Sequence, residues 1–167
     1  MKIDKIYILL IGCMYLFFGF VQFLNGLSSI FLGFIPFNTC ISVSGICIPN
    51  IFPDVFSGIA LLTTGLLFVS SLYFYGRDVI KAKGYFLVGW ILAILMLGLN
   101  IVEILSNILD AYYPILFGGE PNFVWSICED SWGIAPHLLL GLLILPMYFE
   151  NKIYLSELFP KKFYKTR

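Results

Sequence analysis

Four long apolar stretches, joined by short polar segments, dominate the pattern of residues along the chain. They occupy residues 6–31, 52–75, 84–109 and 132–149. A helix needs about 20 mostly apolar residues to cross the hydrocarbon core of a bilayer. Each stretch approaches or exceeds that length, and nothing of domain size remains outside them. The pattern therefore predicts an all-α, polytopic membrane protein in which residues 1–167 form a single four-helix transmembrane domain.

The composition favours the same prediction, because only 12% of the 167 residues are charged, against about 25% in soluble domains. The first apolar stretch is longer than the core of a signal peptide, about 7–15 residues, so we expect it to be retained as a helix. The sequence contains no phosphate-binding loop, nucleophile triad or dinucleotide fingerprint. Their absence argues against the usual soluble enzyme classes.

Charge divides the chain into two sides. The basic residues fall before the first stretch, between the second and third, or after the fourth; they are Lys2, Lys5, Arg77, Lys81, Lys83, Lys152, Lys161, Lys162, Lys165 and Arg167. The positive-inside rule predicts that both termini and the 76–83 connection are cytoplasmic, in a cell membrane. We expect the basic, aromatic tail, residues 151–167, to lie on the inner membrane surface. No nucleic-acid partner is predicted.

Glycines recur at heptad spacing in the first two stretches; they are Gly12, Gly19, Gly26, Gly33, Gly58 and Gly65. Lipid tails are as apolar as leucine, so membrane helices associate through close backbone approach rather than through hydrophobic burial. A line of glycines on one helical face allows that approach. The spacing predicts tight packing between helices along this line.

The third stretch ends in polar residues that share one helical face: Asn100, Glu103, Asn107 and Asp110. At 1.5 Å per residue from Gly84, Glu103 lies about 29 Å up the helix, close to the outer boundary of a core about 30 Å thick. We expect Asn107 and Asp110 to lie above the hydrocarbon, in contact with water. The third helix should thus end in an acidic outer turn.

The only histidine, His137, lies within the fourth stretch, roughly 16 Å from its inner boundary. Ionisable groups inside a membrane are rare and usually face the interior of the bundle. Two interpretations remain open for His137. It is either a neutral packing residue that hydrogen-bonds Gln22 or Asn100, or part of an outward-facing site.

The candidate site is an outer polar layer. Four amides from the first and third helices form the layer, namely Gln22, Asn25, Asn100 and Asn107. The imidazole and nearby acids are a candidate ligand set for a divalent cation such as Zn, Mn or Fe; they are Glu103, His137, Asp110, Glu129 and Asp130. The same groups could relay a proton or bind a cationic ligand. Glu129 and Asp130 also suit the positive end of the fourth helix, and no cofactor is identified.

The cysteines suggest a disulfide in the first outer loop. Cys40 and Cys47 flank a Ser-Gly turn, and in an oxidising exterior we expect them to be bonded to each other. Cys128 lies in the second outer loop, and Cys13 is expected to be buried in the first helix. Four helices with cysteines in both outer loops resemble, in topology and size, the membrane disulfide-generating quinone reductases, the vitamin K epoxide reductases among them. The resemblance implies a quinone-linked thiol–disulfide oxidoreductase, although the Cys-x-x-Cys pair of that family is absent.

A non-enzymatic role explains most of these features with the fewest assumptions. We therefore expect a small subunit or assembly partner of a membrane complex, with helices packed through glycines and an acidic, aromatic outer loop. The alternatives are an outward-facing site that binds or translocates a cation or proton, and the thiol–disulfide oxidoreductase. The expected partners are the lipid bilayer and either other membrane subunits or further copies of the chain.

Overall fold

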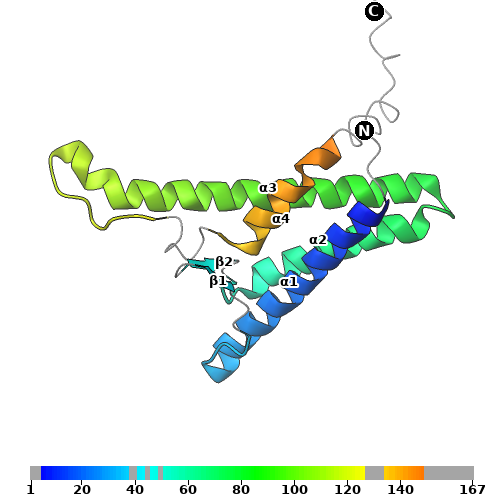
Figure 1. The fold of residues 1–167 in the computed structure, drawn as a ribbon, viewed down its shortest axis with the longest axis horizontal. Helices are drawn as coiled ribbons and strands as arrows, with labels where there is room; N and C mark the ends of the chain where they lie inside the picture. Colours follow the sequence, from blue (N-terminus) through cyan, green and yellow to red (C-terminus); the bar gives the residue numbers. More distant parts are fainter. Residues whose placement is uncertain (1–4, 38–40, 44–45, 49–50, 127–133, 149–167) are drawn as a thin grey trace, which may run out of the picture.

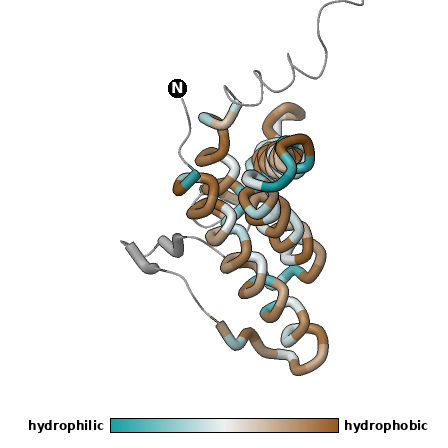
Figure 2. Tube along the Cα trace, turned by 90° about the vertical axis from the view of Figure 1, so that its right-hand side faces the viewer, coloured by the Kyte–Doolittle hydropathy of each residue, from teal (hydrophilic) through white to brown (hydrophobic). Residues whose placement is uncertain are grey.

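A computed structural model describes residues 5–37, 41–43, 46–48, 51–126 and 134–148 and confirms the helical membrane architecture. Its three long helices are α1 (Lys5–Leu32), α2 (Val55–Phe74) and α3 (Val79–Tyr112), each long and apolar enough to cross a membrane. Large apolar residues lie on their outward faces as well as on the inward ones, and Figure 2 shows hydrophobic residues predominating along the helices. Exposed apolar surface on this scale suits contact with lipid.

A shorter helical segment follows the long helices in the described part of the chain. It consists of α4 (Pro136–Ile144) and a 3-10 turn, η2 (Leu145–Met147). Pro136 occupies the first turn, where its missing N–H removes no hydrogen bond. Pro146 lies where the regular α-helix gives way to the 3-10 turn, as expected of a residue that cannot donate to the preceding turn. The helix predicted over 132–149 is thus observed at 136–147. Positions 132, 133 and 149 of the prediction lie outside the described residues.

α3 is longer than predicted at both ends. The sequence pattern suggested residues 84–109, whereas the helix begins at Val79 and continues past Tyr112 into a 3-10 turn, η1 (Tyr113–Phe117). Asp78 caps its start, and the helix continues through Lys81 and Lys83, which hydropathy alone assigns to a loop. Figure 1 shows the C-terminal part of α3 running well past the other helices.

The first loop contains a small antiparallel hairpin of β1 (Ile41–Val43) and β2 (Ile46–Ile48). Ser42 pairs with Cys47 in this register. Cys40 and the side chain of Cys47 lie outside the part of the chain that the structure describes, so the disulfide between them stays a prediction.

α1 and α2 run antiparallel in direct contact (Figure 1), and several glycines lie where their backbones approach each other. A Cβ atom built on Gly26 would lie 2.6 Å from the backbone nitrogen of Val55, and one on Gly58 would lie 2.6 Å from that of Phe23. Gly19 and Gly65 face backbone atoms as closely. Gly33 does not continue this line: it follows the end of α1 with φ at +71°, and no described residue lies within 4 Å of its Cβ position. A positive φ directly after a helix is typical of a C-terminal glycine.

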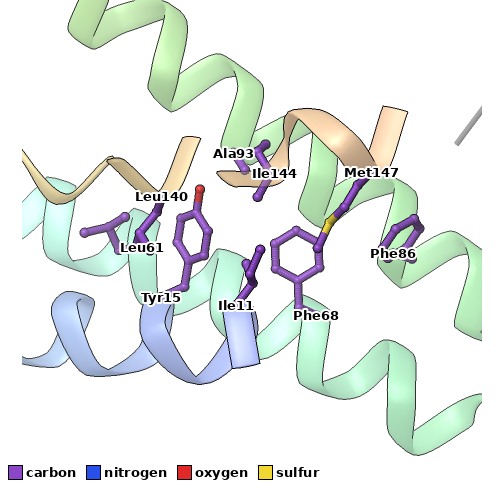
Figure 3. Close-up of a cluster of buried hydrophobic side chains, with 9 residues drawn as sticks. All are labelled: Ile11, Tyr15, Leu61, Phe68, Phe86, Ala93, Leu140, Ile144 and Met147. Atoms are coloured by element: carbon purple, nitrogen blue, oxygen red, sulfur yellow. The ribbon is translucent and has the colours of Figure 1, made fainter. Parts of the chain in front are cut away.

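All four helical segments contribute to one buried apolar cluster (Figure 3). Its members are Ile11, Tyr15, Leu61, Phe68, Phe86, Ala93, Leu140, Ile144 and Met147. The side chains from α4 and η2 fill the space between α1, α2 and α3, and the Tyr7 hydroxyl donates to the carbonyl oxygen of Leu143. The cluster therefore fixes α4 against the three longer helices, which positions the residue at its start, His137.

The N-terminal end of α3 provides a pH-dependent contact. One oxygen of Asp78 accepts the Lys81 N–H at 3.1 Å, and the other lies 3.3 Å from the Lys81 ammonium nitrogen. The backbone hydrogen bond from Lys81 is the main reason that the pKa of Asp78 lies below its ordinary value of 3.8.

Because the folded pKa is depressed, the contribution of this cap is fully present above pH 3.8 and is lost as the pH falls through the folded value. We expect amide hydrogen exchange at Lys81 to lose protection on acidification below that range. Asp78→Asn keeps a capping oxygen but cannot titrate, so its protection should not respond to pH. An equal pH response in the variant would rule out Asp78 as the titrating group.

Candidate functional site

A pocket of about 280 Å³ lies between the beginnings of α2 and α4 and the middle of α3. Its lining combines five polar and four apolar side chains: Asp54, Ser57, Asn100, Glu103 and His137, with Phe56, Ala60, Met96 and Leu99. Two of these residues are acidic, and none is Lys or Arg. Among the described residues, Lys5, Arg77, Lys81 and Lys83 lie near the opposite ends of the helices, away from the pocket.

Three helices supply the polar groups of the pocket, and the local structure of each helix positions them. Asp54 is the N-cap of α2 and accepts the Phe56 N–H at 2.9 Å, which holds its carboxylate at the end of the helix. Asn100 and Glu103 are three residues apart on α3, so they share one face. His137 lies in the first turn of α4, which the apolar cluster holds in place.

His137 is buried, with 4% of its surface exposed, and its Nδ1 atom has no hydrogen-bond partner in the described structure. The Ser57 hydroxyl, on the same pocket, is also without one. Buried polar groups in proteins are normally hydrogen-bonded, and each exception calls for an explanation such as a ligand or water. Both residues line the pocket, but these two atoms are themselves fully buried behind its surface.

Of the two hydrogen-bond partners predicted for His137, Gln22 and Asn100, the structure contradicts Gln22. Gln22 is fully buried in α1, yet neither atom of its amide has a hydrogen-bond partner in the described structure. Asn25, one turn further along, is engaged elsewhere: its amide donates to the Phe37 carbonyl at 2.8 Å and accepts the Phe37 N–H at 3.1 Å. The predicted polar layer is thus divided, since Asn100 lines the pocket while Gln22, Asn25 and Asn107 do not.

The predicted metal ligands are brought together only in part. Glu103 and His137 line the same pocket, whereas Asp110 is exposed further along α3, where its carbonyl oxygen accepts the Asn122 side-chain amide at 2.9 Å. Glu129 and Asp130 lie outside the described residues. Within the described ranges no three His, Cys, Asp or Glu side chains are close enough together to hold a metal ion.

Asp54 and Ser57 were not predicted as site residues. Both fall within the predicted stretch 52–75, which was interpreted only as an apolar membrane span. The available signal was an N-cap: an Asp directly before a long apolar run is a common helix start. Ser57 follows it by three residues and so lies on the same side of the first turn.

The cysteines give no support to thiol chemistry in the described part of the chain. Cys13 was expected to be buried, but it is an exposed free thiol on the outward face of α1. Its neighbours Gly12 and Tyr15 take the inward positions, so helical periodicity turns Cys13 away from the bundle. Cys40 and Cys128, the other candidates for exchange, lie outside the described residues.

Comparison with known proteins agrees with the architecture. Neither a curated protein nor a solved structure matches the chain. The model of one protein family, described as the MJ0565 integral membrane domain, matches residues 2–153. That match spans α1 to α4 and the pocket between them. The chain therefore belongs to the MJ0565 integral membrane domain family.

Proposed function

We propose that this membrane protein binds a small cation or a proton in the pocket between α2, α3 and α4. The observation that carries the proposal is the pocket itself, which brings the buried imidazole of His137 together with the acids Asp54 and Glu103 and has no Lys or Arg among its described lining residues. Ionisable groups at membrane depth commonly mark ion or proton paths.

The distribution of basic residues supports a pocket that faces outward. With Lys5, Arg77 and Lys81 at the inner ends of the helices, the positive-inside rule favours cytoplasmic termini. Asp54 and His137 begin their helices at the other end. Fluorescence of a C-terminal green fluorescent protein fusion tests this orientation, because the fusion partner folds and fluoresces on the cytoplasmic side. A fusion that is made but does not fluoresce would argue for a C-terminus on the outer side.

Binding predicts a ligand-dependent or pH-dependent melting temperature. A ligand at 100 times its dissociation constant stabilises the native state by about 2.7 kcal/mol. We expect purified protein, prepared without chelators or a His-tag, to respond to a cation or to pH, and Glu103→Gln and His137→Gln to lose that response.

Asp110→Asn is the matched control, since it removes an acid on the same helix outside the pocket. A wild-type melting temperature that is indifferent to pH and to every cation tested would refute the proposed function. Equal losses in Asp110→Asn and Glu103→Gln would do the same.

A second candidate function is that of a subunit in a larger membrane assembly. It is favoured by the C-terminal part of α3, which extends past its neighbours (Figure 1) and carries exposed Val102, Leu105 and Leu109. Helix faces of this kind can pack against another membrane protein or a second copy. Cysteine crosslinking at Leu105 in native membranes tests this role, and recovery of uncrosslinked monomer alone would count against it.

A further inference from the structure

We infer that a collar of basic side chains around the end of α2 binds the phosphate groups of anionic phospholipids. The collar consists of Lys5 at the start of α1, Arg77 in the turn after α2, and Lys81 in the first turn of α3. Figure 1 shows these segments at one end of the helices, and the pocket lies toward the other end. The collar is therefore a separate site, which does not depend on the proposed function.

Aromatic rings at the end of α2 hold the cations of the collar in place. The ammonium nitrogen of Lys5 lies 4.0 Å from the centre of the Tyr75 ring, and the guanidinium group of Arg77 lies 4.4 Å from the centre of the Tyr73 ring. A cation above an aromatic face is attracted by the electrons of the ring. Successive helical residues point about 100° apart, so rings at consecutive positions direct the cations to different sides of α2.

Two cations of the collar have no carboxylate partner among the described residues. The ammonium nitrogen of Lys81 lies 3.3 Å from a carboxylate oxygen of Asp78, whereas no described Asp or Glu lies within 4 Å of Lys5 or Arg77. Asp78 is also the only described acid at this end of the helices. This end of the bundle thus carries positive charge that an anion from outside the chain can balance.

Arg77 has the geometry that a phosphate requires. One N–H of its guanidinium group donates to the Tyr73 hydroxyl, which fixes the side chain along the end of α2. The guanidinium group has five N–H donors in a planar fork, so four remain for another acceptor. Such a fork matches two oxygens of one phosphate group. The Tyr73 hydroxyl accepts from Arg77 and keeps its own O–H, which can donate to the same phosphate.

The position of the collar favours a phosphate that belongs to a lipid. α2 and α3 are each long and apolar enough to cross a membrane, so the turn between them lies at a membrane surface. Exposed tyrosines such as Tyr73 and Tyr75 are typical of that level. Ile6 and Ile80, next to Lys5 and Lys81 in the sequence, are 75% and 78% exposed. A phospholipid places its phosphate against the cations and its acyl chains against such apolar side chains, whereas free phosphate would contact only the cations.

The test compares lipids by native mass spectrometry of the delipidated, full-length protein in a maltoside detergent. Dioleoylphosphatidylglycerol is the anionic probe, and dioleoylphosphatidylcholine is its zwitterionic counterpart. Sodium phosphate is added as a competitor, beside sodium chloride at the same ionic strength. The variants are Lys5→Gln and Arg77→Gln. Arg77→Lys keeps the charge without the planar fork, and Lys165→Gln removes one basic charge elsewhere in the sequence as the matched control.

We expect the wild type to bind phosphatidylglycerol at least about tenfold more tightly than phosphatidylcholine, since each basic residue near an anionic lipid contributes about a fivefold factor. Lys5→Gln and Arg77→Gln should each weaken binding of phosphatidylglycerol about fivefold and leave phosphatidylcholine unaffected. Arg77→Lys should fall between the wild type and Arg77→Gln, and Lys165→Gln should match the wild type. The altered side chains of the collar are exposed, and circular dichroism confirms that each variant is folded.

Three results would overturn this assignment of the collar. Equal affinity of the wild type for the two lipids would show that the phosphate of an anionic lipid is not selected. Equal losses in Lys165→Gln and Arg77→Gln, or unchanged binding in both collar variants, would show that net charge rather than the collar attracts the lipid. Competition by sodium phosphate beyond that of sodium chloride would assign the collar to free phosphate instead of a lipid.

Discussion

Gly58→Ala is expected to destabilise the protein by about 3 kcal/mol, at the upper end of the usual cost of overpacking. The added methyl carbon would lie 2.6 Å from the backbone nitrogen of Phe23 and 2.7 Å from its Cα. Backbone atoms cannot turn aside as the end of a side chain can, so α1 and α2 must separate. That separation would loosen the close contact on which association of membrane helices depends. Unfolding in mixed micelles, or steric trapping, measures the change.

Gly98→Ala is the matched control. Gly98 is also a helical glycine, in α3, but no described residue has an atom within 4 Å of its Cβ position. Alanine there should be neutral or slightly stabilising, because glycine is the poorer helix former by up to about 1 kcal/mol. Equal destabilisation by the two substitutions would show that the close α1–α2 contact is not what limits stability.

Asn25→Ala should cost about 2 kcal/mol and release the segment that follows α1. The Asn25 side chain makes two hydrogen bonds with the backbone of Phe37, one to its N–H and one to its carbonyl. Each net hydrogen bond contributes about 1 kcal/mol, and removal of the amide leaves both backbone groups without their protein partner. Amide hydrogen exchange at Phe37 should accelerate in parallel with the loss of stability.

Two further variants test whether the hydrogen bonds of Asn25 to Phe37 cause these effects. Asn25→Asp keeps the acceptor for the Phe37 N–H but loses the donor, so exchange at Phe37 should stay slow while part of the stability is lost. Thr63→Val removes a hydroxyl that bonds only within its own helix, to the Ile59 carbonyl at 2.8 Å, and should change stability by no more than about 0.5 kcal/mol. Unaltered exchange at Phe37 in Asn25→Ala would show that Asn25 does not hold this segment.

The helices could be predicted from hydropathy, but their ends could not. The apolar length requirement identified α1, α2 and α3 because a membrane span needs an uninterrupted apolar run. The same requirement predicted that α3 begins at residue 84, five residues after its observed start at Val79. The reason is that Lys81 and Lys83 are polar yet helical and that Asp78 provides the cap. Hydropathy indicates whether a segment prefers lipid or water, whereas caps and hydrogen bonds determine where the helix begins and ends.

Within the candidate site, the sequence could predict the grouping only of residues that share one helix. Periodicity placed Asn100 and Glu103 on one face of α3, and the structure brings that face to the same pocket as His137. Asp54 was missed because its place beside these residues depends on how α2 packs against α3. The pairing of His137 with Gln22 failed for the same reason: spacing within a helix fixes a face, but contacts between helices depend on their rotation and offset.

The unequal lengths of α2 and α3 determine how the protein fits its bilayer. α2 has 20 residues and α3 has 34, or about 30 and 51 Å at 1.5 Å per residue. The tight turn after Phe74 joins the end of α2 to the start of α3, so both helices set out from the same membrane boundary. The apolar part of α3, from Gly84 to Glu103, is about 29 Å long and matches α2 and a hydrocarbon core of about 30 Å. The last turns of α3, about 14 Å from Glu103 to Tyr112, are therefore expected to form a rigid post that stands above the hydrocarbon, within reach of molecules that never enter the lipid.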